Sequence, residues 1–343
     1  GVMFPLIAQT KKPDWNVAVL DQILDAVAPG QKLARVGDME ILVPNLRAWR
    51  NQLAGGISPN FSFDGIAPVW TDGNLYYTFD ANVSAANQKV FLDSAKEWAT
   101  FANLHFIPRT TEPNYFTVIE NPSLGGGQSA LGMVGGQQFL QIGPSAWNHG
   151  TICHELGHTL GLIHEHQRSD RDSFVTILTN HIIPGSESNF IKLSNSQNQG
   201  AYDFLSVMHY ARNALSIDPG LNTIEPLPAY NQFFNVMGQG DPLLTPLDRA
   251  GMAAVYGAGP IINSDVTNTQ DSGLGSFRTA IYYAFDHPGT SITFHIPTSD
   301  AGFSNGVFNI QPTDQLPSLW NATLIDGGSE PTNSNPNGPE ILL

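Results

Sequence analysis

The start of the chain carries a hydrophobic pattern of helical period. Within residues 13–28, apolar side chains recur three or four positions apart, so that one face of a helix would be hydrophobic. These side chains are Trp15, Val19, Leu20, Ile23, Leu24 and Val27. Pro29 and Gly30 follow and are unfavourable inside a helix, so the pattern predicts a helix that ends before them.

A strand and a second helix are predicted after this first helix. Residues 34–43 read as a strand, and residues 44–53 predict a second helix with Asn45 as its N-cap. The Gly-, Pro- and Ser-containing stretch at 54–60 interrupts both kinds of pattern. We therefore predict a small, mainly helical unit over residues 1–59.

The next two hundred residues mix both periodicities. Residues 84–103 predict a long helix with Ser84 as its cap, and residues 245–257 predict a closing helix capped by Thr245. Short apolar runs between breakers predict strands at 74–80, 104–110 and 114–121. This mixture predicts an α+β domain over residues 60–258.

The composition and the hydrophobic pattern of the sequence change after residue 258. Short strand-like runs at 291–296 and 322–326 lie among Gly, Asn, Pro and Ser. We assign residues 259–343 to a third unit.

Composition narrows the classes of partner. Acidic residues outnumber basic ones by 30 to 15, and the net charge is −15. Binding to nucleic acid or to an anionic membrane surface needs clustered basic groups, so neither is expected. No run of about 18 apolar residues occurs, so we expect no membrane span. The scarcity of charge and the abundance of Gly and Pro favour an extracellular or periplasmic protein rich in turns, and we expect a secreted or cell-surface one.

The candidate chemistry lies in residues 151–172. His154 and His158 stand four residues apart, on one face of a helix, and can bind one ion together. Zinc is the usual choice for neutral imidazole ligands. Glu155 lies beside that face and can accept a proton from water bound to the metal.

A third ligand follows at a defined spacing. Gly161 can adopt a left-handed conformation, end the helix and turn the chain. His164 then returns to the ion, which matters because a catalytic zinc usually has three protein ligands. The alternative is a surface helix with scattered histidines, but it leaves the spacing of Gly161 and His164 unexplained. His166 should point elsewhere and is not expected to be a ligand.

This extended motif resembles that of the metzincin metalloproteases, and its surroundings resemble the astacin family. The matching residues after His164 are Glu165, Arg168, Asp170, Arg171 and Asp172. Residues 202–216 resemble the family's Met-turn segment, and further short matches extend the resemblance over residues 70–257. The resemblance implies a metzincin-like catalytic domain of two subdomains, with an active-site helix and a Met-turn, that hydrolyses peptide bonds with one zinc ion.

The same resemblance implies roles for individual residues. Glu155 would act as general base and then as general acid. Tyr210 would be an additional zinc ligand that moves to hydrogen-bond the oxyanion, and Met208 would form an apolar floor under the metal. Arg212 would reach the pocket beyond the scissile bond and favour an acidic residue there, unless it pairs with a surface carboxylate.

The resemblance also implies a zymogen. Pro-segments of the family block the zinc with an aspartate in a Phe-x-Gly-Asp motif, and Asp38 after Gly37 matches in part, with Arg35 in place of Phe. The alternative is an ordinary turn. Cleavage within residues 57–64 would create a new N-terminus, and Glu165 would pair with it as a structural anchor.

The two disulfides usual in the family are missing, because Cys153 is the single cysteine. Core packing or bound Ca²⁺ must then supply the stability that the crosslinks would give. We expect Cys153 to be a small buried hydrophobic residue.

The third unit carries a resemblance of its own. Residues 266–281 resemble the opening of bacterial right-handed parallel β-helix domains, in which a short helix caps the first coil. We expect a truncated β-helix-like segment that contacts cell-surface or carbohydrate ligands, on a protein of bacterial origin. Two alternatives to an astacin-like protease stay open: another metzincin, such as a matrixin-like protease, and a noncatalytic adhesin with a protease-like scaffold.

Overall fold

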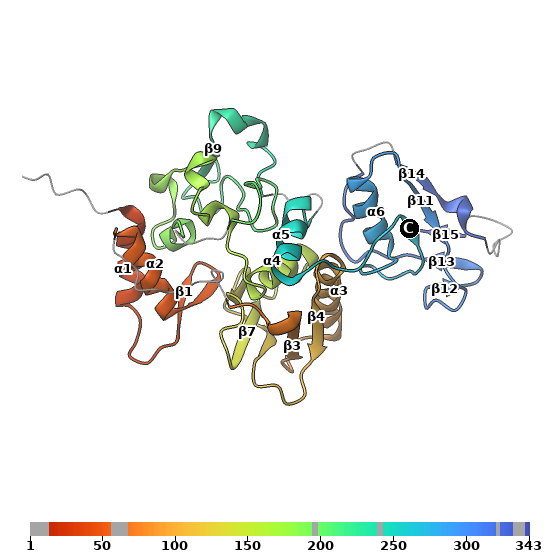
Figure 1. Cartoon of the computed structure of the whole chain (residues 1–343), viewed down its shortest axis with the longest axis horizontal. Helices are drawn as coiled ribbons and strands as arrows, with labels where there is room; N and C mark the ends of the chain where they lie inside the picture. Colours follow the sequence, from red (N-terminus) through yellow and green to blue (C-terminus); the bar gives the residue numbers. More distant parts are fainter. Residues whose placement is uncertain (1–13, 56–67, 194–197, 239–242, 320–322, 332–339) are drawn as a thin grey trace, which may run out of the picture.

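The computed structural model describes residues 14–55, 68–193, 198–238, 243–319, 323–331 and 340–343. The predicted boundary between residues 59 and 60 and the predicted cleavage site at 57–64 lie outside these ranges. Helices and strands alternate irregularly, as the α+β prediction requires. Figure 1 shows the chain running from the N-terminal helices on the left, through a central body, to a C-terminal group of strands on the right.

Within residues 14–55, the N-terminal unit contains two helices and a hairpin. Its elements are α1 (Trp15–Asp25), β1 (Leu33–Val36), β2 (Met39–Leu42) and α2 (Val43–Leu53). The single strand predicted over 34–43 is in fact a hairpin, in which Val36 pairs with Met39 across a two-residue turn. Gly37 takes the first turn position with φ +67°, a conformation that glycine adopts without strain.

The predicted cap of the second helix is wrong. α2 begins at Val43, and Leu42 is its N-cap residue. Pro44 explains the early start, because proline fits the first turn of a helix, where its missing N–H is not needed.

The central body is built on a mixed sheet of seven strands. Its own strands are β3 (Asn74–Phe79), β4 (His105–Pro108), β5 (Tyr115–Glu120), β6 (Gly127–Ala130) and β7 (Gln137–Ile142). The order in the sheet is β1-β2-β6-β7-β5-β3-β4, so the N-terminal hairpin extends the sheet at its β6 edge. β2 runs parallel to β6, with Met39 opposite Ser129.

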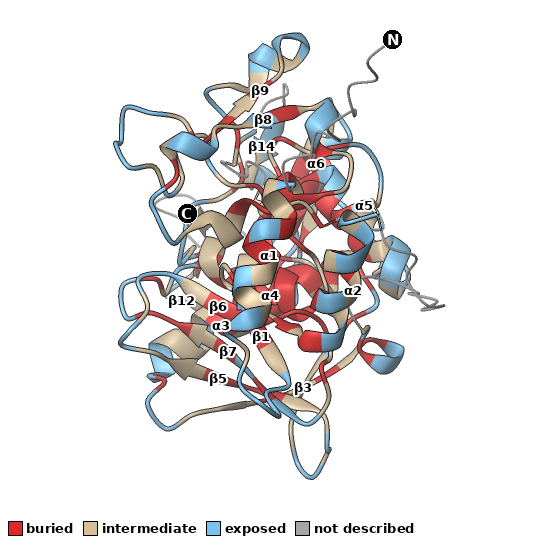
Figure 2. Ribbon diagram, turned by 90° about the vertical axis from the view of Figure 1, so that its left-hand side faces the viewer, coloured by how far each residue is buried: buried red, intermediate tan, exposed pale blue. Residues whose placement is uncertain are grey.

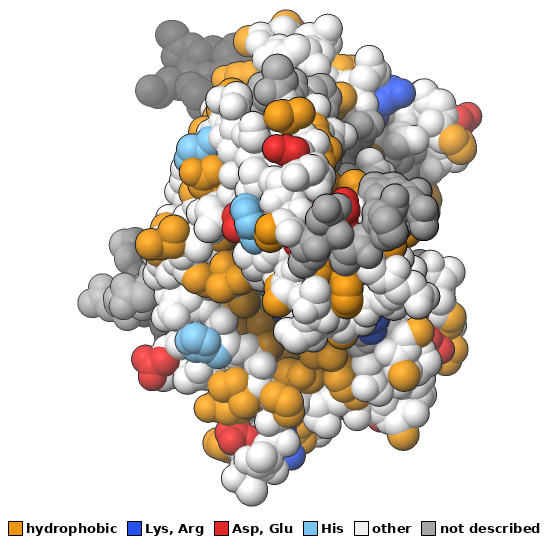
Figure 3. Space-filling view, turned by 90° about the vertical axis from the view of Figure 1, so that its right-hand side faces the viewer, with side chains coloured by type: hydrophobic (Ala, Val, Ile, Leu, Met, Phe, Trp, Pro, Cys, Tyr) orange, Lys and Arg blue, Asp and Glu red, His pale blue; other side chains and the backbone are white. Residues whose placement is uncertain are grey.

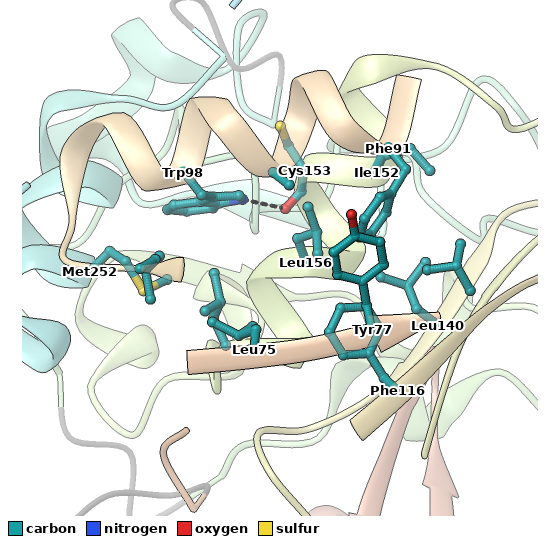
Figure 4. Packing of buried hydrophobic residues seen from close by; sticks show 14 of the residues in the cluster. Leu75, Tyr77, Phe91, Trp98, Phe116, Leu140, Ile152, Cys153, Leu156 and Met252 are labelled. Atoms are coloured by element: carbon teal, nitrogen blue, oxygen red, sulfur yellow. Dashed lines mark hydrogen bonds between the residues drawn. The ribbon is translucent and has the colours of Figure 1, made fainter. Parts of the chain in front are cut away.

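Two helices pack together on this sheet and enclose the main core. They are α3 (Ala85–Phe101) and α4 (His149–Thr159). Ser84 caps α3 as predicted, since its side chain accepts a hydrogen bond from the Asn87 N–H. The core between helices and sheet is aromatic: Phe91 of α3 packs on Tyr77, and the Trp98 indole donates to the Cys153 carbonyl at 3.0 Å (Figure 4). Cys153 is fully buried, as expected.

The chain after α4 forms a second lobe with little regular structure. Its strands are β8 (Val175–Ile177) and β9 (Ile224–Pro226), and its short 3-10 helices are η2 (Glu165–Gln167), η3 (Arg171–Ser173), η4 (Thr179–His181), η5 (Glu187–Phe190) and η6 (Pro228–Phe233). A separate aromatic core holds this lobe together, with Tyr202 stacked on Phe174 and Phe204 stacked on Phe233. Helix α5 (Pro246–Tyr256) follows, with the predicted cap Thr245 in a complete capping box with Asp248.

The described part of the C-terminal segment contains one α-helix and six short strands. They are β10 (Asp265–Val266), α6 (Phe277–Asp286), β11 (Ser291–Phe294), β12 (Phe303–Ser304), β13 (Val307–Asn309), β14 (Leu324–Asp326) and β15 (Ile341–Leu342), with the 3-10 helix η7 (Gly327–Ser329). β10, β11 and β14 pair in parallel, as do β13 and β15. None of the helices in the described ranges is long and apolar enough to cross a membrane.

Candidate metal centre and catalytic site

Helix α4 ends in a tight glycine turn. The Leu162 N–H donates to the Gly157 carbonyl and the Gly161 N–H to the His158 carbonyl, both at 2.9 Å, which is the hydrogen-bond pair of a Schellman motif. Gly161 has φ +104°, in the range that glycine reaches most easily. This turn sends the chain back across the end of the helix, and His164 returns to the side of His154 and His158.

The three predicted histidine ligands converge through their Nε2 atoms. Each ring is fixed from behind, because each Nδ1 donates at 2.8 Å to an oxygen that can only accept. The acceptors are the carbonyls of Val207 and Leu162 and the side-chain oxygen of Gln167. Every Nε2 therefore presents a lone pair to the centre, the arrangement that orients imidazole toward a metal.

Asp38 completes the group from the N-terminal hairpin. Its Oδ1 lies 3.2 Å from His164 Nε2 and 3.6 Å from His158 Nε2, and its Oδ2 lies 3.6 Å from His154 Nε2. Burial opposes the charged carboxylate, but the neighbouring imidazole groups hold the pKa of Asp38 well below its usual value. Asp38 and the three histidines form one group able to hold a metal ion.

The residues fit zinc. Asp38 Oδ1 and His158 Nε2 are buried without a hydrogen-bond partner in the described structure, and the Nε2 atoms of His154 and His164 lie only 3.3 Å apart. Lone pairs that face one another in this way need a cation between them. Three imidazole nitrogens and one carboxylate oxygen are a tetrahedral zinc donor set. Bound Ca²⁺ stays a prediction, and this nitrogen-rich centre is not a site for it.

Glu155 stands beside this centre, buried, with Oε2 lacking a hydrogen-bond partner in the described structure. Burial, followed by the nearby Asp38 carboxylate, raises the pKa of Glu155 well above its ordinary value. Its side chain lines a cleft of about 380 Å³ together with Gly127 and Tyr210. A Cβ atom at position 127 would lie 2.4 Å from Glu155 Cγ, so this glycine leaves room for the carboxylate.

Tyr210 and Met208 lie on either side of the histidines. The Tyr210 hydroxyl donates to Asn189 Oδ1 at 3.0 Å and lies 3.4 Å from Asp38 Oδ2. Met208 is buried against the helix, and a Cβ atom at Gly157 would come within 2.6 Å of its sulfur. Tyr210 therefore lies at the centre and Met208 lies against α4, while their roles as an additional ligand and an apolar floor stay predictions.

Glu165 lies away from the centre, beside a separate cavity of about 90 Å³. It accepts hydrogen bonds from Arg168 Nη1 and from the Asp203 N–H, both at 2.8 Å. Burial, aided by the charges of Asp248 and Asp203, nevertheless raises the pKa of Glu165 to about 8. The described residues that line this cavity thus include three acidic groups, Glu165, Asp203 and Asp248, and one positive charge, that of Arg168.

The remaining predicted residues lie outside the metal centre. His166 is buried against the rings of His164 and Tyr210 and is not part of the ligand group among the described residues. Arg212 donates to Asn222 Oδ1 at 3.0 Å and stacks over the Phe234 ring. It is not among the described residues that line the cleft. Its proposed contact with substrate stays a prediction.

Two supporting residues escaped the sequence analysis. Gln167 orients His164, and Asn189 holds Tyr210 while its carbonyl bonds to His166 Nε2. Asparagine and glutamine are common in this region of the chain, so no signal in the sequence singles these two out.

A glycine-terminated helix with two histidines and a glutamate, joined by a third histidine on an α+β fold, defines the class of zinc metallopeptidases. The sequence model of the astacin peptidase family matches residues 64–257, and the chain belongs to this family. This membership rules out a matrixin-like protease.

Individual relatives agree with the family match. The chain is 38% identical over 167 residues to bone morphogenetic protein 1 of Xenopus laevis, a match that covers 48% of this chain and 23% of that protein. It is 33% identical over 225 residues to an astacin-like metalloendopeptidase of Coturnix japonica, covering 64% and 50% of the two chains. The chain thus spans at most half the length of these relatives.

A solved structure shares the fold. High choriolytic enzyme 1, a hatching enzyme zinc-protease from Oryzias latipes, superposes with a TM-score of 0.51 at 31% identity. The match covers 58% of this chain and 98% of that one.

Proposed function

We propose that this chain is a secreted zinc-dependent endopeptidase made as a zymogen. The observation that carries the proposal is the convergence of three imidazole Nε2 atoms beside a buried carboxyl group that opens onto a cleft. Zinc in such a site acts as a Lewis acid toward the scissile carbonyl and lowers the pKa of a bound water.

The chain's own residues would perform the proton transfers. Glu155 would accept the proton of the attacking water and deliver it to the leaving amine. Burial favours this cycle, because a carboxyl group with a raised pKa exchanges protons readily near neutral pH. The Tyr210 hydroxyl would leave Asn189 and donate to the oxyanion that develops on the scissile carbonyl.

Latency would come from Asp38. Its carboxylate lies within 3.6 Å of all three histidine Nε2 atoms and would bind the zinc in place of water. The Asp38 carbonyl accepts from the Ser129 N–H at 2.9 Å, and the Glu40 carbonyl accepts from the Leu131 N–H at 2.9 Å. The N-terminal segment thus occupies the edge of β6, and its removal would open the cleft.

Glu165 would receive the N-terminus that activation creates. An ammonium group in its cavity would meet the carboxylates of Glu165, Asp203 and Asp248, only one of which is paired through Arg168. The raised pKa of Glu165 supports this role, since the latent form leaves that acid short of positive charge.

The C-terminal segment would begin a right-handed parallel β-helix. Parallel pairing of β10, β11 and β14 supports this interpretation, as does α6, which precedes β11 where the resemblance places a capping helix. The face on this side of the molecule is mostly uncharged, with hydrophobic side chains among polar ones (Figure 3). Such a surface suits the proposed carbohydrate or cell-surface ligand of a bacterial protein.

The test is a peptidase assay on purified, activated chain with measured zinc content. We expect cleavage of an unstructured protein substrate that a chelator abolishes and added Zn²⁺ restores. A chain with one bound zinc and no cleavage after removal of residues 1–59 would instead favour the noncatalytic adhesin.

A further inference from the structure

The C-terminal segment reaches into the core of the catalytic domain. Tyr282 of α6 is only 1% exposed and belongs to the same hydrophobic cluster as Trp98 and Leu156. Its ring meets Phe101 of α3 edge to face, with centroids 5.0 Å apart. Figure 1 shows α6 on the side of the molecule where α3 and α5 lie. A residue from beyond the family match is therefore part of the catalytic core.

A chain of hydrogen bonds leads from this ring to the active-site helix. The Tyr282 hydroxyl donates to one oxygen of Glu97 and accepts from the Leu244 N–H at 3.1 Å. The other Glu97 oxygen contacts Nε2 of His149, the first residue of α4. All three side chains are buried, and such networks hold their members in one geometry.

A second contact reaches the same turn of the helix. Asp314 Oδ2 accepts a hydrogen bond from the His149 N–H at 3.0 Å. This N–H is among the first four of α4, which have no acceptor within the helix. Asn148 satisfies another, that of Thr151. A carboxylate at this end also complements the positive end of the helix dipole.

Further polar contacts fix the segment in place. Arg249 of α5 forms a two-pronged pair with Asp286, at 2.6 and 2.9 Å. The Ser272 hydroxyl donates to the Asp93 carbonyl at 2.6 Å. Arg278 donates to the carbonyls of Gln315 and Asp314, at 2.8 and 3.3 Å, and so steadies the loop that presents the capping carboxylate.

We infer that the C-terminal segment is a working part of the catalytic unit, in which Tyr282 and Asp314 position the first turn of α4 and, through it, the metal ligand His154 and the base Glu155. This inference rests on the proposed peptidase function. His154 follows His149 by five residues, about 7.5 Å along a helix. A tilt or fraying of the first turn therefore moves the catalytic groups, which tolerate only small displacements.

The experiment uses the full-length chain, activated, with single substitutions that preserve shape. Tyr282→Phe keeps the ring in the core and removes only the hydroxyl, and Asp314→Asn keeps the size of the side chain. Tyr283→Phe is the matched control, because Tyr283 lies next to Tyr282 on α6 but stacks on His287. Hydrogen exchange of residues 149–153, zinc content, kcat and KM are measured for each.

We expect faster exchange at residues 149–153 and a fall in kcat of about threefold to tenfold for Tyr282→Phe, the range for one lost hydrogen bond. KM and zinc content should change by less than about twofold, and Tyr283→Phe should match the parent. A role in stability alone would lower the melting temperature and leave kcat per folded molecule unchanged. That result, or unchanged exchange in both Tyr282→Phe and Asp314→Asn, would overturn the inference. If the parent chain proves inactive, the proposed function fails, while exchange at 149–153 still decides the inference.

Discussion

The N-terminal and C-terminal segments both bring a carboxylate to the active-site helix, but to different parts of it. Asp38 arrives from the hairpin and faces the histidine Nε2 atoms. Asp314 arrives on the other side and bonds the first N–H of α4. The first carboxylate occupies atoms that catalysis needs, and the second satisfies a backbone group that catalysis never uses. If both proposals hold, the same chemical group would inhibit at one part of the helix and support at another.

The two segments also attach in different ways. The N-terminal segment relies on strand pairing with β6 and on an apolar cluster that includes Leu20, Trp49 and Ile191. Figure 2 shows α1 in front of the buried α4 when the molecule is seen from this side. The C-terminal segment relies on one inserted ring and a buried polar network. Removal of the N-terminal segment would expose an edge of β6 and the apolar surface beneath it, whereas removal of Tyr282 would leave a cavity in the core between α3 and the sheet.

Glu155→Gln should have the largest effect. In the activated enzyme it should lower kcat by about 10²- to 10⁴-fold, because an amide cannot accept the water's proton. Zinc content should stay near one ion per chain, measured by atomic spectroscopy. Activity within about tenfold of the parent would show that another residue is the base. The residual activity of this variant is the baseline for measuring how much the N-terminal and C-terminal segments change activity.

Asp38→Ala tests the inhibitory side of the comparison. We expect the uncut chain to gain peptidase activity by at least about tenfold, because the blocking carboxylate is gone. Glu40→Gln is the matched control, since Glu40 lies two residues further along β2 and bonds Gln128 instead of the histidines. Equal latency in Asp38→Ala and the control would remove Asp38 from the mechanism.

Glu165→Gln should change the melting temperature differently in the latent and the activated forms. Losing the carboxylate should lower the melting temperature of the activated enzyme by roughly 2–4 °C, as expected for about 1 kcal/mol. The latent form should respond differently. A folded pKa of about 8, above the ordinary value of 4.5, means that stability from this group falls as pH rises from about 5 to 8. Glu165→Gln should flatten that slope, and equal melting curves for both forms would contradict the anchor role.

The smallest expected effect is a loss of hydrogen-exchange protection of α6 at low pH. Burial opposes the charge of Glu97, but the charges of His149 and Arg278 and its hydrogen bonds lower the pKa of this acid, which Tyr282 and Cys153 also face. The pKa of His149 is raised despite burial, and the charge that does so is the buried Glu97 carboxylate, because Cys153 stays a neutral thiol. Glu97 therefore adds to the free energy of unfolding above its ordinary pKa, and this addition is lost as the pH falls toward the lowered pKa of the folded state. The addition from His149 is lost only at high pH. We expect exchange protection of α6 to drop below about pH 4.5, and to lose that dependence in Glu97→Gln.

The convergence of the three candidate histidine ligands could be predicted because they lie in one short stretch with a fixed helical spacing. His154, His158 and the turn at Gly161 are local features, and local geometry is readable from sequence. The same holds for the caps Ser84 and Thr245. Asn45 failed as a cap because Pro44 set the start of the helix one turn earlier.

Other parts of the site were out of reach because distant segments build them. Strand β6 has the sequence Gly-Gln-Ser-Ala and lacks the alternation that marks a strand, yet it receives the N-terminal hairpin. The contact between Glu97 and Tyr282 joins residues 185 positions apart. Nothing in a single sequence reports such a pairing, and burial in a common core is what creates it.

The lone cysteine has a consequence for handling the protein. Cys153 is sealed between α3 and α4, and burial raises the pKa of its thiol, so little thiolate is available for exchange. A reducing buffer has no disulfide to break within the chain, because Cys153 is its single cysteine. A cysteine placed at an exposed position of α1 would therefore be the one reactive thiol in the molecule. A dye attached there could follow the release of the N-terminal segment in real time.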